Sequence, residues 1–213
     1  MNLSHITGAF IHNATAHKDA GKRPCLVYAE ISTKNVPFLP LEAGQGVIAA
    51  TDGYRLHISR VPLNGRLGLV SVLKNGKEWA TVAAPEDVDN FPDYNVCIPV
   101  HNLTTGPLLD WPTISEATAK GLSNAGMWAT IIEREGKVHF TGFHASGSAS
   151  IKQQAAAGAL RLNPLYTAQA IGGSAKPLVS FSLNISPLRP VCFHSENGDN
   201  LAVVTADAIP NYT

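Results

Sequence analysis

The sequence predicts an α+β protein in which one helix followed by a small antiparallel sheet forms a unit that is repeated along the chain. Alternating apolar and polar residues, typical of strands, occur in pairs joined by turn-forming residues. Three stretches with helical spacing of apolar residues each precede such a group of strands. One helix with a short sheet cannot bury both faces of the sheet, so we expect neighbouring units to pack together.

Three helices are expected from apolar spacing and from capping residues. The stripe of the first helix that should face the core consists of Leu3, Ile6, Phe10, Ile11 and Ala14. The second helix should run from Pro112 to about Asn124, with one buried face made of Ile114, Ala117, Gly121 and Leu122. The third is short: Asn163 is its cap, Pro164 is its first residue, and it ends at Gly172 and Gly173.

The remaining regular segments are expected to be antiparallel hairpins. Residues 127–143 form two alternating runs with a turn at Glu135-Gly136, and residues 189–206 form two more around Asn197-Gly198. Residues 46–63 contain the pair Asp52-Gly53 between two apolar runs. Residues 68–86 form a hairpin around Asn75-Gly76 without a convincing helix before it.

The composition limits the possible partners. The 213 residues are 45% hydrophobic and 15% charged, which suits globular domains with ordinary cores. Basic and acidic residues number 16 each, so any basic surface must be local. Residues 1–19 lack the basic start and the apolar core of a signal peptide, so we expect a soluble, cytoplasmic protein. Cys25, Cys97 and Cys192 lie in apolar contexts and are expected to be small buried hydrophobic residues.

Two domains are expected, at about 1–100 and 101–213. The proposed boundary is the stretch "PVHNLTTGP" at 99–107, because its proline, glycine and polar residues suit a linker.

Two motifs resemble those of a known family. "AATDGYRL" at 49–56 resembles the Ala-Thr-Asp-Gly-His-Arg-Leu motif in the middle domain of bacterial sliding clamps, the beta (processivity) subunit of DNA polymerase III. "NFPDYNVCIP" at 90–99 resembles the Phe-Pro-Asp-Tyr stretch that joins the middle and last domains of that family. Residues 18–26, 160–171 and 186–204 are similar to further family segments, so the resemblance covers almost the whole chain.

The chain departs from the family in three ways. It has two clamp-like domains where the family has three, so it resembles a reduced member. The stretch from Leu56 to Phe91 is much shorter than in the family and lacks one helix. The last residues, "TADAIPNYT", replace the family's tail.

The resemblance implies a DNA-clamp fold and a protein without enzymatic activity or cofactor, which encircles duplex DNA and tethers a polymerase. Two domains per chain imply a head-to-tail ring of three copies. In the family, a groove between the middle and last domains receives a short, partly hydrophobic peptide from polymerases, loaders and repair proteins. Matched residue by residue, the groove would comprise Thr51, Gly53, Tyr54, Arg55, Leu56, Pro92, Cys97, Val203 and Val204, with Tyr54 and Arg55 facing the peptide.

The cations expected to contact DNA are few. The face of the first helix opposite its apolar stripe carries His5, Ala9, His12 and Ala16, with no Lys or Arg. The basic residues left for phosphate contact are Lys18, Lys22, Arg23 and Lys120, although Lys120 could instead pair with Glu116.

Three alternatives remain. His144 lies near Ser146 and Ser148, but residues so close on one strand rarely form a nucleophile and base pair. Glu196 and Asp199 lie in a hairpin turn, but their spacing is not that of a calcium loop, and no metal site is expected. The main competitor is a protein-binding module or clamp mimic that keeps the clamp fold without encircling DNA, which the neutral first helix favours.

Overall fold

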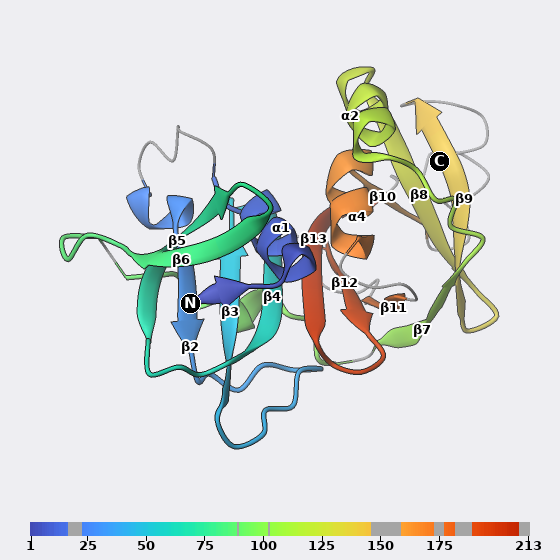
Figure 1. The fold of residues 1–213 in the computed structure, drawn as a ribbon. Coiled ribbons are helices and arrows are strands. Elements are labelled where there is room, and N and C mark those ends of the chain that lie inside the picture. Colours follow the sequence, from blue (N-terminus) through green and yellow to red (C-terminus); the bar gives the residue numbers. More distant parts are fainter. Residues whose placement is uncertain are drawn as a thin grey trace. The chain divides into compact units, whose positions relative to one another are not determined.

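A computed structural model describes residues 1–16, 23–88, 90–101, 103–145, 159–172, 177–181 and 189–208. The chain divides into two compact units (Figure 1). Unit 1 contains Met1–Cys97 together with Asn197–Ala202, and unit 2 contains Ile98–Glu196 together with Val203–Thr213. The division falls at Cys97 and Ile98, and unit 1 also takes a short segment from near the end of the chain.

Unit 1 is a six-stranded sheet with one α-helix packed on it. Its strands lie in the order β1-β6-β5-β2-β3-β4, and neighbouring strands in this order pair antiparallel. The helix α1 packs on β3 to β6. The elements are β1 (Asn2–Leu3), α1 (His5–Asn13), η1 (Pro24–Val27), β2 (Ala29–Ser32), β3 (Gln45–Thr51), β4 (Arg55–Pro62), β5 (Gly68–Asn75), β6 (Glu78–Ala83) and η2 (Tyr94–Cys97).

Contact between α1 and β6 is very close at Gly8. A Cβ atom added there would lie 2.2 Å from Cγ of Trp79, so only glycine lets the helix approach the indole. Phe10, Ile11 and Ala14 are buried, as the apolar spacing predicts. Ile6 is the exception: it is 61% exposed, because this nine-residue helix turns only part of the predicted stripe toward the sheet.

Two segments of unit 1 differ from a simple strand pattern. The run "RPCLVYAEI", expected to be one strand, begins with the 3-10 turn η1, and extended structure starts only at Ala29. From Leu56 to Phe91, the described residues form β4, β5 and β6 but no helix, as the shortened sequence suggested.

Unit 2 contains two α-helices and a second sheet. Its strands follow the order β13-β10-β8-β9-β7-β11-β12, and β12 also pairs with β13, whose residues from Val203 onward belong to this unit. The pairing of β7 with β9 is parallel, whereas β10 with β13, β10 with β8, β8 with β9, β11 with β7 and β11 with β12 pair antiparallel. The elements are β7 (Thr104–Leu109), α2 (Glu116–Asn124), β8 (Met127–Arg134), β9 (Lys137–Ala145), β10 (Ala159–Leu162), α4 (Pro164–Ile171), β11 (Pro177–Phe181), β12 (Arg189–Ser195) and β13 (Asn200–Ala208).

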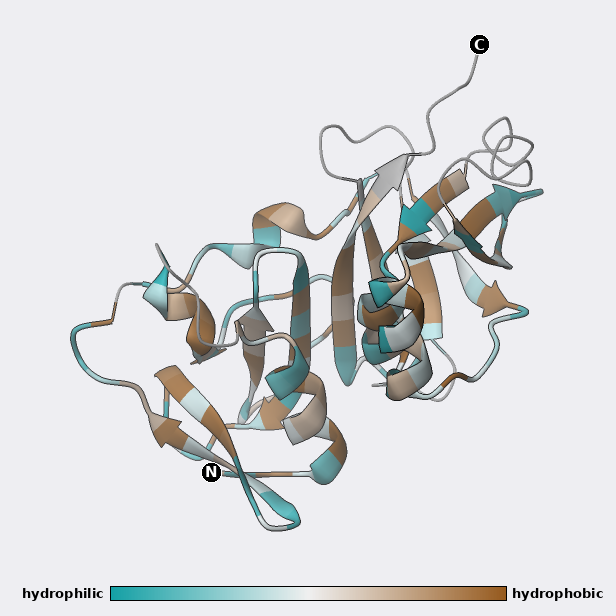
Figure 2. Ribbon diagram, turned by 90° about the horizontal axis from the view of Figure 1, so that it is seen from above, coloured by the Kyte–Doolittle hydropathy of each residue, from teal (hydrophilic) through white to brown (hydrophobic). Residues whose placement is uncertain are grey.

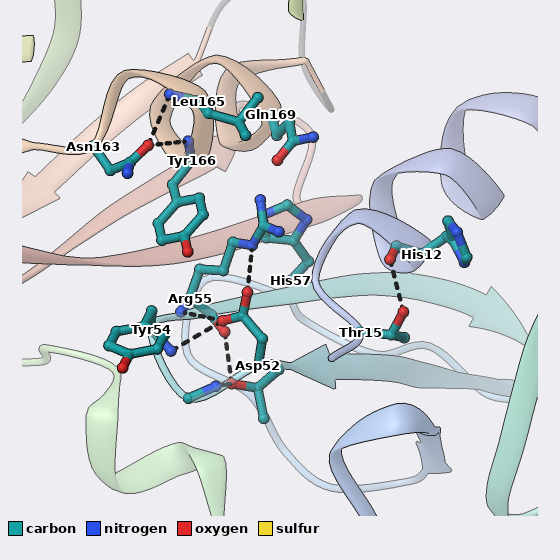
Figure 3. Close-up of polar contacts among 12 residues, drawn as sticks. His12, Thr15, Asp52, Tyr54, Arg55, His57, Asn163, Leu165, Tyr166 and Gln169 are labelled. Atoms are coloured by element: carbon teal, nitrogen blue, oxygen red, sulfur yellow. Dashed lines mark hydrogen bonds and ion pairs between the residues drawn. The ribbon is translucent and has the colours of Figure 1, made fainter. Parts of the chain in front are cut away.

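The third predicted helix is confirmed as α4, whereas α2 differs from its prediction. Asn163 caps α4 by accepting hydrogen bonds from two backbone N–H groups (Figure 3). The helix α2 starts at Glu116 instead of Pro112, because the hydroxyl of Ser115 accepts the N–H of Thr118 and sets the cap. Its buried residue is Ala119, while the predicted buried residues Ala117 and Gly121 are exposed and Ile114 and Leu122 are half-buried.

The four predicted turns lie between paired strands. At Glu135-Gly136 both residues have positive φ, 55° and 71°, which a two-residue hairpin loop needs. Apolar and polar residues alternate along many of the strands (Figure 2). The predicted linker at 99–107 is only partly irregular, since its last four residues belong to β7 and pair with β11.

Two of the three cysteines are buried, Cys25 and Cys192, as expected. Cys97 is exposed and corrects the prediction. It ends the 3-10 turn η2, where its thiol donates to the carbonyl of Tyr94 at 2.9 Å. Among the described helices, none is both long and apolar enough to cross a membrane.

Candidate functional site

The Asp-Gly turn between β3 and β4 is fixed by its own side chains (Figure 3). Oδ1 of Asp52 accepts hydrogen bonds from the backbone N–H groups of Tyr54, at 3.0 Å, and of Arg55, at 3.1 Å. The hydroxyl of Thr51 donates to the carbonyl of Arg55 at 2.6 Å and accepts the N–H of Gly53 at 3.1 Å. Gly53 has φ +92°, a conformation that other residues rarely adopt. The turn is therefore rigid without help from a ligand.

Arg55 does not face outward, which corrects the sequence-based expectation. Its side chain is 7% exposed, and its Nε donates to Oδ2 of Asp52 at 3.0 Å. A buried guanidinium needs a counter-charge, and the carboxylate three residues earlier supplies it. Sequence reasoning omitted Asp52 from the site, although an aspartate before glycine is a known signal for turns held by its side chain.

Tyr54 is the side chain that the turn presents to solvent. It is 64% exposed, whereas its neighbour Leu56 is 2% exposed and belongs to the core. Its backbone N–H is held by Asp52, and its side chain is mostly exposed. An exposed aromatic residue on a rigid turn is the type of group that anchors protein–protein contacts.

Behind the turn lies His57, which sequence reasoning missed. Its ring is fully buried, stacks on Phe10 with ring centroids 4.3 Å apart, and donates from Nδ1 to the Phe10 carbonyl at 2.6 Å. Burial lowers the pKa of His57 from 6.5 to about 3; the Phe10 carbonyl opposes this shift, and the charge of Arg55 adds to it. The signal was present in the strand: Arg55, His57 and Ser59 alternate as polar residues and are all buried.

The Phe-Pro-Asp-Tyr stretch packs through its aromatic residues. Phe91 and Tyr94 are buried and meet edge to face, with ring centroids 6.0 Å apart. The hydroxyl of Tyr94 is 3.2 Å from that of Ser32, and burial raises the pKa of Tyr94 to about 12. Pro92 is half-buried and Cys97 is exposed. This packing holds the segment against the sheet of unit 1.

No protein-family model and no curated protein sequence matches the chain. Among solved structures, it is similar to the DNA polymerase III beta chain of Streptococcus pneumoniae (TM-score 0.56, 16% identity). It is also similar to the beta sliding clamp of Caulobacter crescentus (TM-score 0.54, 15% identity) and to the DNA polymerase III beta subunit of Thermotoga maritima (TM-score 0.53, 13% identity). Each comparison covers 97% of this chain.

The chain has the fold of the bacterial sliding clamps. It spans 64–65% of the length of these clamps. At 12–16% identity, the likeness across such structures concerns the clamp fold, and it assigns no residue a role.

The nine residues predicted to form the peptide groove of this clamp fold are divided between the units. Seven lie in unit 1, namely Thr51, Gly53, Tyr54, Arg55, Leu56, Pro92 and Cys97. Val203 and Val204 lie in unit 2, where they are 2% and 0% exposed. A groove that combines both sets stays a prediction.

Of the four residues predicted to contact DNA, the structure describes two, Arg23 and Lys120. Lys18 and Lys22 lie outside the described residues. Arg23 is exposed at the start of η1, and Lys120 is exposed on α2 in unit 2. The carboxylate of Glu116, a predicted partner of Lys120, accepts a hydrogen bond from Nε2 of Gln169 at 3.3 Å.

Two of the alternatives considered from the sequence concern a serine nucleophile and a metal site. Ser146 and Ser148 lie outside the described residues. A serine–histidine contact does occur between Ser180 and Nε2 of His194, at 3.1 Å, but Ser180 is fully buried and its hydroxyl also bonds Thr105. Asp199 pairs with Arg60, and the described residues hold no cluster of three metal-binding side chains.

Proposed function

We propose that the protein is a sliding-clamp-like processivity factor that encircles duplex DNA and docks short peptide motifs of polymerases or repair proteins. The observation that carries the proposal is the Asp52-Gly53 turn, where a sequence resembling the clamp motif forms a rigid platform under an exposed tyrosine. The clamp fold over 97% of the chain supports it. The ring would consist of three copies in the cytoplasm.

The corrected geometry changes the role of each residue in the turn. Tyr54 would touch the peptide directly. Arg55, which the sequence suggested as a second contact, would act as a positioning residue, because its ion pair with Asp52 holds the backbone beneath the ring. Leu56 is 2% exposed and would support the surface from the core.

The test is binding of a fluorescently labelled polymerase-tail peptide to Tyr54→Ala. We expect the affinity to fall at least about tenfold, because truncating an aromatic anchor typically costs 2 kcal/mol or more. The control is Leu67→Ala, which removes a side chain of similar exposure, 61%, from a loop of the same unit. Equal affinities for wild type and Tyr54→Ala would remove the turn from the peptide site.

A second function has one observation in its favour. Residues 1–16, which include α1, contain no Lys, Arg, Asp or Glu, so the helix offers no fixed charge to a DNA backbone. This favours a module that keeps the clamp fold and binds proteins without encircling DNA.

The mass of the protein in solution distinguishes a DNA-encircling ring from a protein-binding module. Light scattering at micromolar concentration should give about three times 22.6 kDa for a closed ring. A strict monomer that also fails to bind DNA would rule out the ring and leave the protein-binding module.

A further inference from the structure

We propose that the β5–β6 hairpin of unit 1 carries the cations that touch the phosphates of duplex DNA, with Lys74 and Lys77 as the contact residues. The inference rests on the proposed function. Because α1 has no Lys or Arg, the lysines that contact DNA would come from the hairpin next to it.

Lys74 lies on the same side of the sheet as α1. It is directly opposite Trp79 in the β5–β6 pairing, and directly opposed residues point to the same face. Trp79 in turn packs under Gly8, and its ring lies 5.0 Å from that of His12. The ammonium of Lys74 lies over the indole of Trp79, 5.9 Å from its centroid. The indole therefore places this cation beside α1.

The positive charge of Lys74 and the negative charge of Glu78 lie on opposite faces of the hairpin. Glu78 pairs with Asn75, one position along from Lys74, so its side chain points to the face away from α1. Lys77 is exposed in the turn between the strands. Within the described ranges, no carboxylate pairs with Lys74 or Lys77. Since residues 1–16 have no acidic side chain, the α1 side of unit 1 has a local positive charge at this hairpin.

Arg66 adds a third basic side chain to the β5–β6 hairpin. It is exposed, and its guanidinium donates to the backbone carbonyl of Thr81 on β6 at 3.2 Å. This bond holds the arginine along the strand and leaves its charge without a carboxylate partner among the described residues.

Phosphate is the occupant that this surface fits. The exposed apolar residues of the hairpin, Leu73 and Val82, lie on the face away from Lys74. The face of the hairpin that carries Lys74 thus has no exposed large apolar residue of its own. Membrane surfaces are bound by cations together with inserted apolar groups, whereas a DNA backbone is bound by cations alone.

The test compares two charge-reversed hairpins. Lys74→Glu combined with Lys77→Glu changes the β5–β6 hairpin. Arg134→Glu combined with Lys137→Glu changes the β8–β9 hairpin of unit 2 by the same net charge, also at exposed positions next to the turn. Binding of a short fluorescein-labelled linear duplex is measured by anisotropy at several salt concentrations, with wild type as the reference.

We expect the β5–β6 variant to bind at least about tenfold more weakly and to lose about two from the slope of log affinity against log salt, since each phosphate contact contributes about one. The control should change both values much less. Equal losses in both variants would overturn the inference and leave the proposed function standing. A wild type that binds no duplex would overturn the inference together with encircling, while peptide docking would still be judged by the Tyr54→Ala experiment.

Both variants change exposed residues, so thermal unfolding should show that each remains folded. If the double variant unfolds, the single variant Lys77→Glu tests the inference instead. Lys77 lies exposed in the turn, and this single change should lower the salt slope by about one. An unchanged slope would overturn the inference.

Discussion

At the scale of single residues, the turn and the strand behind it show how polar groups are kept inside unit 1. Arg55 is satisfied by Asp52, and His57 by the carbonyl of Phe10. The charge of Arg55 is balanced by its ion pair with Asp52. The second ring nitrogen of His57, Nε2, is buried and has no hydrogen-bond partner among the described residues. His57 is therefore stable in this place only as a neutral ring.

Because His57 is buried as a neutral ring, the free energy of unfolding should depend on pH. Its pKa is about 3 in the folded chain and about 6.5 when exposed, so between these values the unfolded chain binds one more proton. The free energy of unfolding should therefore fall as the pH drops from 6.5 toward 3, by at most about 1.4 kcal/mol per pH unit from this group. Above pH 6.5 the contribution is complete.

Urea unfolding of wild type and His57→Gln at pH 7, 6, 5 and 4 measures this. The variant should be less stable at pH 7, because it loses the stacking on Phe10, yet its stability should fall less steeply with acid. His5→Gln, at an exposed position, should follow the wild-type profile. Parallel profiles for wild type and His57→Gln would show that His57 does not cause the acid dependence.

At the scale of elements, the packing of α1 on β6 depends on the absence of one side chain. Trp79 occupies the space that a Cβ at Gly8 would need, with three of its atoms within 2.7 Å of that position. Gly121 on α2 is the opposite case, because a Cβ there would meet nothing within 4 Å. Both glycines lie inside helices, yet only the first has a packing reason.

Gly8→Ala should destabilise the protein by about 1–3 kcal/mol, because the helix must move away from the indole. Gly121→Ala should raise stability by up to about 1 kcal/mol, since alanine is the better helix former and nothing opposes it. The urea midpoints of the two variants would thus shift in opposite directions. A Gly8→Ala protein as stable as wild type would contradict the close packing of α1 on Trp79.

At the scale of the whole molecule, the two units are not separated cleanly along the chain. Residues Asn197–Ala202 belong to unit 1, although the predicted domains placed them in the second. Arg60 holds this segment by donating to the carbonyl of Asn197 and to the carboxylate of Asp199, and Ser59 donates to the side chain of Asn200 at 2.6 Å. Unit 1 thus obtains part of its structure from residues far along the sequence.

The sequence by itself determined the features that depend on near neighbours. The hairpin turns at 135–136 and 197–198 and the cap of α4 need only a few adjacent residues, and they were predicted correctly. The turn predicted at Asn75-Gly76 lies one residue later, at Gly76-Lys77, because Asn75 ends β5 and pairs with Glu78. The clamp fold was also recognised from two short motifs, and the solved clamps share that fold.

Only the tertiary structure decided which side chains are buried and which are available. In the structure Arg55 is buried, Cys97 and Ile6 are exposed, and the buried residue of α2 is Ala119. Burial depends on groups brought close from distant parts of the chain, and no local pattern contains that information. The exposed surface of the Asp-Gly turn therefore became one aromatic ring on a fixed support, instead of the tyrosine and arginine pair that the sequence suggested.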